Sequence, residues 1–397
     1  MKKFAFLLML LLALGMSAAV AEVSGDFEYR VNKGTAEIIG YTGSATELTI
    51  PAELGGYKVT SIGYAVFYNC EFLINVTIPD SVTSIGKSAF SGCESLASIN
   101  IPSSVITIGD YAFSSCESLT SISIPQSVTA IGDYTFSNCG YLTCVKLPDN
   151  ITSIGDWAFF GCESLVNIQL PSNVLSIGDW AFSSCKALTS INIPSGVTSI
   201  GENAFYDCYA LSSISLPNSI TSIDKGAFYF CKALTSILLP DSVVKIEDNT
   251  FSCCTSLSHV TIPNSVTSIH KKAFYLCKKL TTITIPDSVT FISKDAFADC
   301  HPSLTLRVGC TSYAKQYAID NGLKYTCGHD HSADVPGDAN GNGSVDINDA
   351  LAILEYCAGT GAAVNTLTAD VDGSGNVDLR DALLIFQREA GWDVKIQ

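Results

Sequence analysis

The sequence predicts a repeat solenoid built mainly of β-structure, followed by a small α-helical domain. Two observations support this prediction. A cysteine recurs eleven times at a constant spacing of 23 residues, from Cys70 to Cys300. Near the C-terminus, a twelve-residue loop rich in Asp, Asn and Gly occurs twice, starting at Asp338 and at Asp370. A short constant period means that each copy is one structural unit, which buries its apolar face only against its neighbours.

Each copy of the 23-residue repeat begins with a strand pattern. The copy at Leu96–Pro102 reads Leu-x-x-Ile-x-Ile-Pro. Its alternation predicts a strand in which Ile99 and Ile101 point inward and the residues between them point outward. Pro102 ends the strand because proline cannot donate a hydrogen bond to a neighbouring strand.

The second half of each copy supplies more apolar side chains. In the same copy these are Val105, Ile108 and the segment Ala112–Cys116, with Gly109 at a turn where a side chain would crowd the backbone. The repeated cysteine has two possible roles: a buried neutral thiol that fills the core, or a disulfide partner of a neighbouring copy. We favour the buried thiol, because the position lies among core residues and eleven cysteines cannot pair completely.

The N-terminal residues 1–21 have the pattern of a signal peptide. Lys2 and Lys3 precede an apolar run over residues 4–14, and Ala19–Ala21 has the small residues of a cleavage site. The apolar run is too short for a membrane span. We therefore expect a secreted, extracellular protein without a membrane span.

The rest of the chain divides by pattern. A short helix is predicted from Tyr313 to Gly322, as part of a cap over the last repeat. The segments that we expect are an N-terminal cap at 22–48, the repeats at 49–303, a C-terminal cap at 304–327, a polar linker at 328–335 and the helical domain at 336–397.

Composition and charge exclude some functions. The formal net charge is −16 and the chain has no basic stripe, which argues against a nucleic-acid partner. The five histidines have no partnered motif, and no set of base, nucleophile and oxyanion donors converges in the sequence. We therefore do not predict an enzyme.

Four consecutive copies place an aromatic residue two positions before the repeated phenylalanine, and each follows an aspartate. In a stacked array they would form a ladder of rings beside a ladder of carboxylates. Such a ladder could stack on sugar rings or anchor a protein, or it could only cover the edge of the neighbouring copy. The candidate ligand-binding residues are Tyr111, Tyr134, Trp157 and Trp180, which follow Asp110, Asp133, Asp156 and Asp179.

The two acidic loops have the spacing of EF-hand-like calcium sites. Oxygen-bearing residues stand at positions one, three, five, nine and twelve, the seventh residue offers its carbonyl, and the sixth is Gly343 or Gly375. Each loop runs into a helix pattern, at Ala350–Cys357 and at Ala382–Ala390, so we predict two calcium ions. The candidate ligands are Asp338, Asn340, Asn342, Ser344, Asp346 and Asp349 in the first loop, and Asp370, Asp372, Ser374, Asn376, Asp378 and Asp381 in the second.

The repeat as a whole resembles a known family. Its pattern Ile-Pro-x-Ser-Val-Thr-x-Ile-Gly-x-x-Ala-Phe-x-x-Cys is similar to the BspA-like leucine-rich repeats of bacterial surface and secreted proteins, over about residues 26–326. This resemblance implies a curved solenoid with a parallel sheet along one side.

The duplicated loop–helix segment, from Pro336 to the C-terminus, resembles a type I dockerin. Its loops end in aspartate instead of the EF-hand glutamate, and no helix pattern precedes the first loop. The resemblance implies calcium-dependent docking onto a cohesin module of a scaffoldin, in a cellulosome-type assembly. The cohesin contacts that it implies are Ile347, Asn348, Leu351, Leu354, Glu355, Leu379, Arg380, Leu383, Phe386 and Gln387.

Two of these contact positions depart from the family. Many dockerins carry Ser or Thr at the tenth and eleventh loop positions, where this chain has Ile347–Asn348 and Leu379–Arg380. The cohesin type is therefore open, and the two copies are not equivalent. A calcium-stabilised domain without a partner is the plainer alternative.

These features favour a secreted, non-catalytic recognition protein. Its solenoid would bind a protein or a polysaccharide, and its dockerin would attach it to a scaffoldin for polysaccharide catabolism. The alternatives are a cell-surface adhesin or structural spacer and, less favoured, a polysaccharide-acting enzyme.

Overall fold

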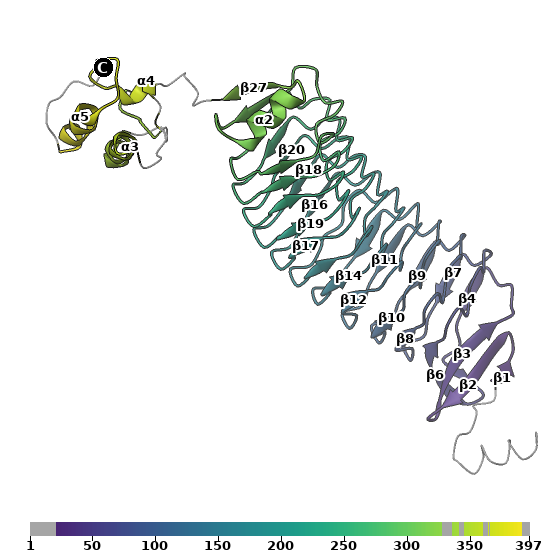
Figure 1. Cartoon of the computed structure of the whole chain (residues 1–397). Coiled ribbons are helices and arrows are strands. Elements are labelled where there is room, and N and C mark those ends of the chain that lie inside the picture. Colours follow the sequence, from purple (N-terminus) through teal and green to yellow (C-terminus); the bar gives the residue numbers. More distant parts are fainter. Residues whose placement is uncertain (1–20, 328–335, 341–344, 360–363, 365, 391–397) are drawn as a thin grey trace, which may run out of the picture. The chain divides into compact units, whose positions relative to one another are not determined.

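The computed structural model describes residues 21–327, 336–340, 345–359, 364 and 366–390 (Figure 1). The chain divides into two compact units, with the boundary between Tyr325 and Thr326. The predicted linker lies outside the described residues, and so does the predicted signal peptide except for Ala21.

The first unit opens with an antiparallel cap. Strand β1 (Ala21–Ser24) pairs with β2 (Phe27–Asn32), and β2 pairs with β3 (Thr35–Tyr41). β3 then pairs in parallel with β6 (Tyr57–Ile62), while the short β5 (Glu53–Leu54) pairs with β6 in the antiparallel sense. The cap thus changes an antiparallel meander into the parallel pairing of the repeats.

Two parallel ladders of short strands run along the solenoid, each divided into separate sheets. From β7 onward in the first ladder, and throughout the second, paired residues are 23 positions apart, such as Val76 with Ile99. The predicted β-solenoid is confirmed, but the second ladder was not predicted as strands. The first ladder comprises β4 (Glu47–Thr49), β7 (Asn75–Thr77), β9 (Ser98–Asn100), β11 (Ser121–Ser123), β13 (Cys144–Lys146), β16 (Ser190–Asn192), β18 (Ser213–Ser215), β20 (Ser236–Leu238), β22 (His259–Thr261), β24 (Thr282–Thr284) and β26 (Thr305–Val308). The second comprises β6, β8 (Ser84–Ile85), β10 (Thr107–Ile108), β12 (Ala130–Ile131), β14 (Ser153–Ile154), β15 (Ser176–Ile177), β17 (Ser199–Ile200), β19 (Ser222–Ile223), β21 (Lys245–Ile246), β23 (Ser268–Ile269) and β25 (Phe291–Ile292).

The third side of each coil has no strand but is also hydrogen-bonded to its neighbour. The amide of Phe113 donates to the carbonyl of Thr135 (3.0 Å), and the amide of Ser115 donates to the carbonyl of Ser137 (2.7 Å). Inside, the repeated phenylalanines form one continuous stack, in which Phe113 and Phe136 are parallel within 4° at 5.7 Å. These turn bonds and the ring stack inside, together with the strand pairs, hold neighbouring coils in register.

The repeated cysteines are buried thiols that are not joined in disulfides. From Cys93 onward each Sγ donates a hydrogen bond to the carbonyl of the phenylalanine 26 residues earlier, as from Cys139 to Phe113 (3.1 Å). Burial raises the pKa of Cys139 to about 12. This agrees with the buried neutral thiol expected from the sequence and adds a donor function, which requires the protonated form.

The C-terminal cap contains helix α2 (Tyr313–Asp320), which begins after Ser312 and is followed by Gly322 at φ +65°. The helix predicted there is present. Tyr317 from α2 is buried and its ring lies 6.2 Å from that of Phe297, so the helix covers the end of the phenylalanine stack. Strand β27 (Lys324–Cys327) completes the cap beside β26.

The second unit has three helices among its described residues: α3 (Ile347–Cys357), α4 (Thr366–Ala369) and α5 (Leu379–Glu389). Helices α3 and α5 begin three residues earlier than predicted, because Asp346 and Asp378 cap their first turns. The two helices pack on a small apolar core that includes Ala339, Ala350, Ile353, Ala369, Val371, Ala382 and Ile385.

The thiol column predicts alkaline destabilisation. A thiol in the unfolded chain ionises near its ordinary pKa of 9.0, whereas folded Cys139 stays neutral up to about pH 12. The free energy of unfolding should therefore be unaffected by this group below pH 9.0 and fall as pH rises from 9.0 to about 12. Each such thiol should contribute a loss of about 1.4 kcal/mol per pH unit. Guanidinium unfolding across this range measures the slope. The variant Cys139→Ser should have a shallower slope, and an unchanged slope would contradict the assignment.

Candidate functional site

The second acidic loop brings three predicted calcium ligands together. Carboxylate oxygens of Asp370, Asp372 and Asp381 all lie within 4.8 Å of one another. Asp381 is fully buried, and its two oxygens accept hydrogen bonds from the backbone amides of Val371 (2.9 Å) and Asp378 (2.8 Å). The twelfth loop residue therefore holds the two ends of the loop together and also faces its centre.

The middle of this loop folds back on its first residue. Gly375 adopts φ +87°, and its amide donates to Asp370 Oδ2 (2.7 Å), while the amide of Ser374 donates to Asp370 Oδ1 (2.9 Å). The hydrogen bond from Ser374 and the nearby Arg380 lower the pKa of Asp372. The three carboxylates lie close together, which suits a hard cation with oxygen ligands.

The first loop repeats this arrangement where it is described. Asp349 is fully buried, and its two oxygens accept from the amides of Asn340 (2.9 Å) and Asp346 (2.8 Å). Asp338 is also buried, and its carbonyl accepts from Thr368 Oγ1 (2.6 Å), which joins the first loop to α4. The candidate ligands Asn342 and Ser344 lie outside the described residues.

Both loops therefore fit calcium by the chemistry of their donors. The described candidate ligands carry oxygen atoms, and a bound cation would neutralise carboxylates that otherwise repel one another. The residues that would hold it are the predicted set, with Asp349 and Asp381 closing each loop. The identity of these ligands remains a prediction.

Helices α3 and α5 present apolar side chains to solvent at corresponding positions. Ile347 and Leu351 are 53% and 50% exposed on α3, and Leu379 and Leu383 are 62% and 53% exposed on α5. The other predicted cohesin contacts lie on the same helices: Asn348, Glu355, Arg380 and Phe386 are exposed, and Leu354 and Gln387 are half-buried. We call these surfaces the α3 face and the α5 face.

On the solenoid, the four predicted aromatic residues form a continuous stack. The ring centroids of Tyr111 and Tyr134 are 4.4 Å apart, those of Tyr134 and Trp157 5.5 Å, and those of Trp157 and Trp180 4.7 Å, all within 8° of parallel. The ladder predicted from the sequence is thus present. Its inner rings have both faces against another ring and are half-buried.

These four residues also share an unusual backbone conformation. Tyr111, Tyr134, Trp157 and Trp180 have φ between +56° and +59°. The same column continues with Asn203, which tolerates this left-handed region better than an aromatic residue does. Bulky residues there cost about 1–3 kcal/mol each. Four in succession mean that the ring stack compensates for the strain, or that the rings serve a function.

The aspartate ladder has a structural role that the sequence did not reveal. Asp133 Oδ1 accepts a hydrogen bond from the amide of Asp156 (2.9 Å), and Asp156 Oδ1 accepts from that of Asp179 (2.8 Å). The series continues to Glu202, whose amide donates to Asp179 Oδ1 (2.7 Å). Each carboxylate thus satisfies a backbone amide of the next coil.

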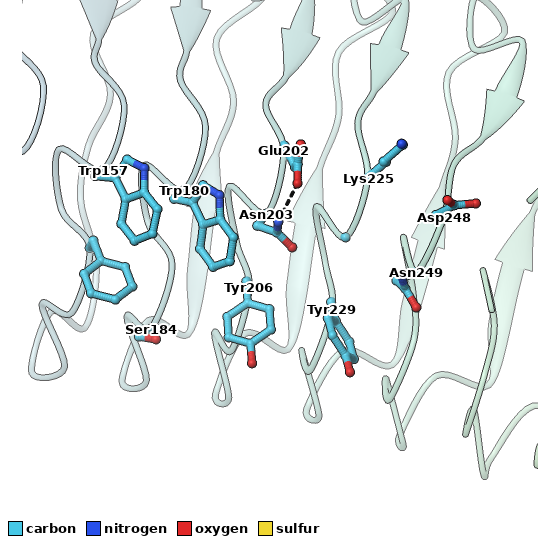
Figure 2. Close-up of a pocket in the computed structure, with 12 residues that line it drawn as sticks. Trp157, Trp180, Ser184, Glu202, Asn203, Tyr206, Lys225, Tyr229, Asp248 and Asn249 are labelled. Atoms are coloured by element: carbon cyan, nitrogen blue, oxygen red, sulfur yellow. Dashed lines mark hydrogen bonds between the residues drawn. The ribbon is translucent and has the colours of Figure 1, made fainter. Parts of the chain in front are cut away.

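A shallow groove of about 500 Å³ begins where the aromatic ladder ends (Figure 2). We call it the end groove. Sequence reasoning found Trp157 and Trp180 but missed the other lining residues. The sequence feature that could have indicated this groove is the change from an aromatic residue at position 180 to Asn203 and then Gly226 in the same column. The missed residues are Phe160, Ser184, Glu202, Asn203, Tyr206, Lys225, Gly226, Tyr229, Asp248 and Asn249.

The repeats match a known family over more than half of the chain. Residues 60–189 and 177–304 match the BspA type leucine-rich repeat region, in six copies. The chain belongs to the BspA-type leucine-rich repeat family. Residues 336–388 match the type I dockerin domain, so this BspA-type protein carries a C-terminal dockerin.

Solved structures of bacterial leucine-rich repeat proteins are similar to this BspA-type chain. A leucine-rich cell surface protein from Faecalibacterium prausnitzii is 33% identical, with 77% of this chain and 98% of that chain covered and a TM-score of 0.49. A leucine-rich repeat protein from Bacteroides ovatus is 27% identical, with 77% and 99% covered and a TM-score of 0.52. A leucine-rich repeat protein from T. pallidum is 29% identical, with 54% and 91% covered and a TM-score of 0.41. No curated protein matches the chain.

Both families found in this BspA-type protein are non-catalytic, and both are typical of extracellular bacterial proteins. Type I dockerins bind calcium and pair with cohesins. Among the described residues, no helix has the length and apolar character that a membrane crossing requires.

The loop geometry predicts that each loop holds one calcium ion. The full chain, first depleted with a chelator, should bind two ions in a calorimetric titration. Asp381→Ala removes one carboxylate of the cluster and the bonds that close the second loop, so this variant should bind one ion. Asp320→Ala, which changes an exposed aspartate of α2, is the matched control and should keep two. Two ions in Asp381→Ala would contradict the ligand assignment.

Proposed function

We propose that this is a secreted, non-catalytic recognition protein in two parts. Its dockerin binds a cohesin module of a scaffoldin when calcium is present, and its solenoid binds a protein or a polysaccharide. The observation that carries the proposal is the duplicated loop–helix unit, in which each acidic loop sets the first turn of a helix with an exposed apolar face.

The coupling between loop and helix supports calcium dependence. Asp346 and Asp378 are candidate ligands and also the capping residues of α3 and α5. Asp349 and Asp381 close the loops and complete the capping boxes of the same helices. A cation bound in either loop therefore fixes the start of the helix that carries the docking face.

The chemistry of the two faces indicates what kind of cohesin surface would fit. The tenth loop position is Ile347 on one face and Leu379 on the other, and Leu351 and Leu383 follow one turn later. These apolar pairs favour a partner with an apolar patch over a partner whose surface would form hydrogen bonds with the hydroxyl groups of Ser or Thr. At the eleventh position, Asn348 is neutral and Arg380 is charged. Only the α5 face would therefore favour an acidic rim on the partner.

A cell-surface role is the second candidate. The relative from Faecalibacterium prausnitzii, at 33% identity, is described as a cell surface protein. An adhesin or spacer of this kind would bind its target without any cohesin. Cohesin binding in calcium therefore separates the two functions.

A cohesin panel tests the proposal. The full chain is immobilised and exposed to cohesins of several types, with calcium and with chelator. We expect at least one cohesin to bind in calcium and to dissociate in chelator. Absence of binding to every cohesin in calcium would refute the docking function.

Charge substitutions on the two faces locate the contact. Leu351→Glu and Leu383→Glu each place a charge in an exposed apolar face, and such a charge should weaken binding by about 2 kcal/mol or more at the face that is used. The double variant should not bind. Leu175→Glu makes the same change at a leucine of the solenoid that is 56% exposed and should leave cohesin affinity unchanged. Normal binding by the double variant would contradict the assignment of these faces.

A further inference from the structure

We propose that the end groove binds a neutral glycan chain, with one sugar ring stacked against the indole of Trp180. This inference rests on the proposed recognition role of the solenoid and names its ligand class and its site. It also moves the centre of binding from the aromatic ladder itself to the coils that follow it.

The interior of the ladder has no room for a sugar ring. Tyr134 has stacked neighbours at 4.4 Å and 5.5 Å, and Trp157 has them at 5.5 Å and 4.7 Å. A sugar stacks through its C–H face on the face of an aromatic ring, so a ring with both faces covered offers only its edge. Stacking is therefore restricted to the two ends of the ladder.

The two ends of the ladder differ. At the N-terminal end, Lys87 Nζ lies over the Tyr111 ring at 5.3 Å, and the same lysine is 3.8 Å from Asp110. At the other end, Trp180 has a parallel ring only on the side of Trp157. On its other side the column continues with Asn203, which carries no ring. The Trp180 end therefore offers the indole face that a sugar requires.

The groove beyond Trp180 has aromatic walls at an angle to the indole. The ring of Tyr206 is 5.5 Å from that of Trp180 and tilted by 48°, and Tyr229 meets Tyr206 edge-on at 5.2 Å. Figure 2 shows these two tyrosines on successive coils beyond the parallel indoles. The opening of about 500 Å³ lies within the usual size of small-molecule sites. Because it crosses successive coils, it suits an extended chain better than a single compact ligand.

Polar groups along the groove match the hydroxyl groups of sugars. Glu202 and Asn203 line it on one coil, and Asp248 and Asn249 line it two coils later. Asn203 Nδ2 donates to Glu202 Oε1 (3.2 Å), so the carboxylate and the amide are already oriented together. A carboxylate accepts and an amide both accepts and donates, which allows paired hydrogen bonds to neighbouring hydroxyls.

The charge of the groove selects among glycans. Its lining contains two carboxylates, Glu202 and Asp248, and one amine, Lys225, which leaves one net negative charge. An acidic polysaccharide would meet repulsion there, whereas a neutral one would not. The chain as a whole also has a net charge of −16. A neutral glycan is therefore the occupant that the groove favours.

The repeat itself offers a sharp test. Asn203→Tyr gives the seventh copy the residue type that earlier copies already hold at the same backbone position, where Asn203 has φ +52°. The new ring should extend the ladder, cover the Trp180 face and fill the groove. Ser88→Tyr is the matched control, because Ser88 occupies the same column at φ +57° beyond the opposite end of the ladder.

The full chain with calcium is titrated with cellohexaose, xylohexaose and mannohexaose, and with polygalacturonate as the anionic probe. We expect at least one neutral oligosaccharide to bind, Asn203→Tyr to weaken it by about 30-fold or more, and Ser88→Tyr to leave it unchanged. A second pair of variants tests the same site by removing a ring: Trp180→Ala should weaken oligosaccharide binding, and Tyr111→Ala should not.

Three results would overturn the proposal: no binding of any neutral probe, preferential binding of polygalacturonate, or equal losses in Asn203→Tyr and Ser88→Tyr. Cohesin binding is measured on the same variants and should not change. If cohesin docking persists while every glycan fails, only the end groove is refuted. If docking fails while a neutral glycan binds at the groove, the recognition role stands without the scaffoldin.

Discussion

Register between neighbouring coils is the constraint on which the whole solenoid depends. Neighbouring coils bond through a row of turn amides and, along much of the solenoid, through pairs of short parallel strands, and the phenylalanine stack fixes the same spacing inside. A one-residue slip would turn Val76 or Ile99 outward and separate the rings. The buried thiols restrain the register further, since from Cys93 onward each donates a hydrogen bond to a carbonyl of the preceding coil. Coils that are bonded and stacked in this way cannot shift independently, and identical positions therefore form columns.

These columns give the surface its chemistry. Where a column repeats one residue type, its members interact with each other. Carboxylates accept hydrogen bonds from backbone amides of the next coil, and aromatic rings cover one another. Such columns stabilise the array but leave few groups for a ligand. Where a column changes type, as from Trp180 to Asn203 and Gly226, one ring face and several polar groups remain without a neighbour of their own kind. A repeat protein therefore gains specific sites at the breaks in its pattern.

Much of the fold could be predicted from the sequence, because the repeat period fixes the register between coils. The spacing of Cys70 to Cys300 predicted the solenoid and the buried thiols, and the loop spacing predicted the acidic residues that the second loop brings together. The two-residue strands such as Ser84–Ile85 were missed, because two residues are too short to show alternation. The hydrogen bonds of Asp133 and Asp156 were missed, because the sequence does not show whether an exposed acid accepts a hydrogen bond from a backbone amide. The orientation of the rings needs the left-handed backbone at Trp157, which no side-chain pattern reveals.

Duplication has opposite results in the two units. In the solenoid, a copied apolar residue meets its equivalent on the next coil, and both are removed from water, as Phe113 and Phe136 are. In the dockerin, the two helices pack through Ala350, Ile353, Ala382 and Ile385, and a second set of apolar residues, which includes Leu351 and Leu383, is left facing solvent on each helix. Exposed leucines contribute little to folding, and the docking that we propose would account for a fold that keeps them in matching places. The solenoid thus uses repetition to complete its own core, whereas in the dockerin repetition leaves apolar surface exposed on both helices.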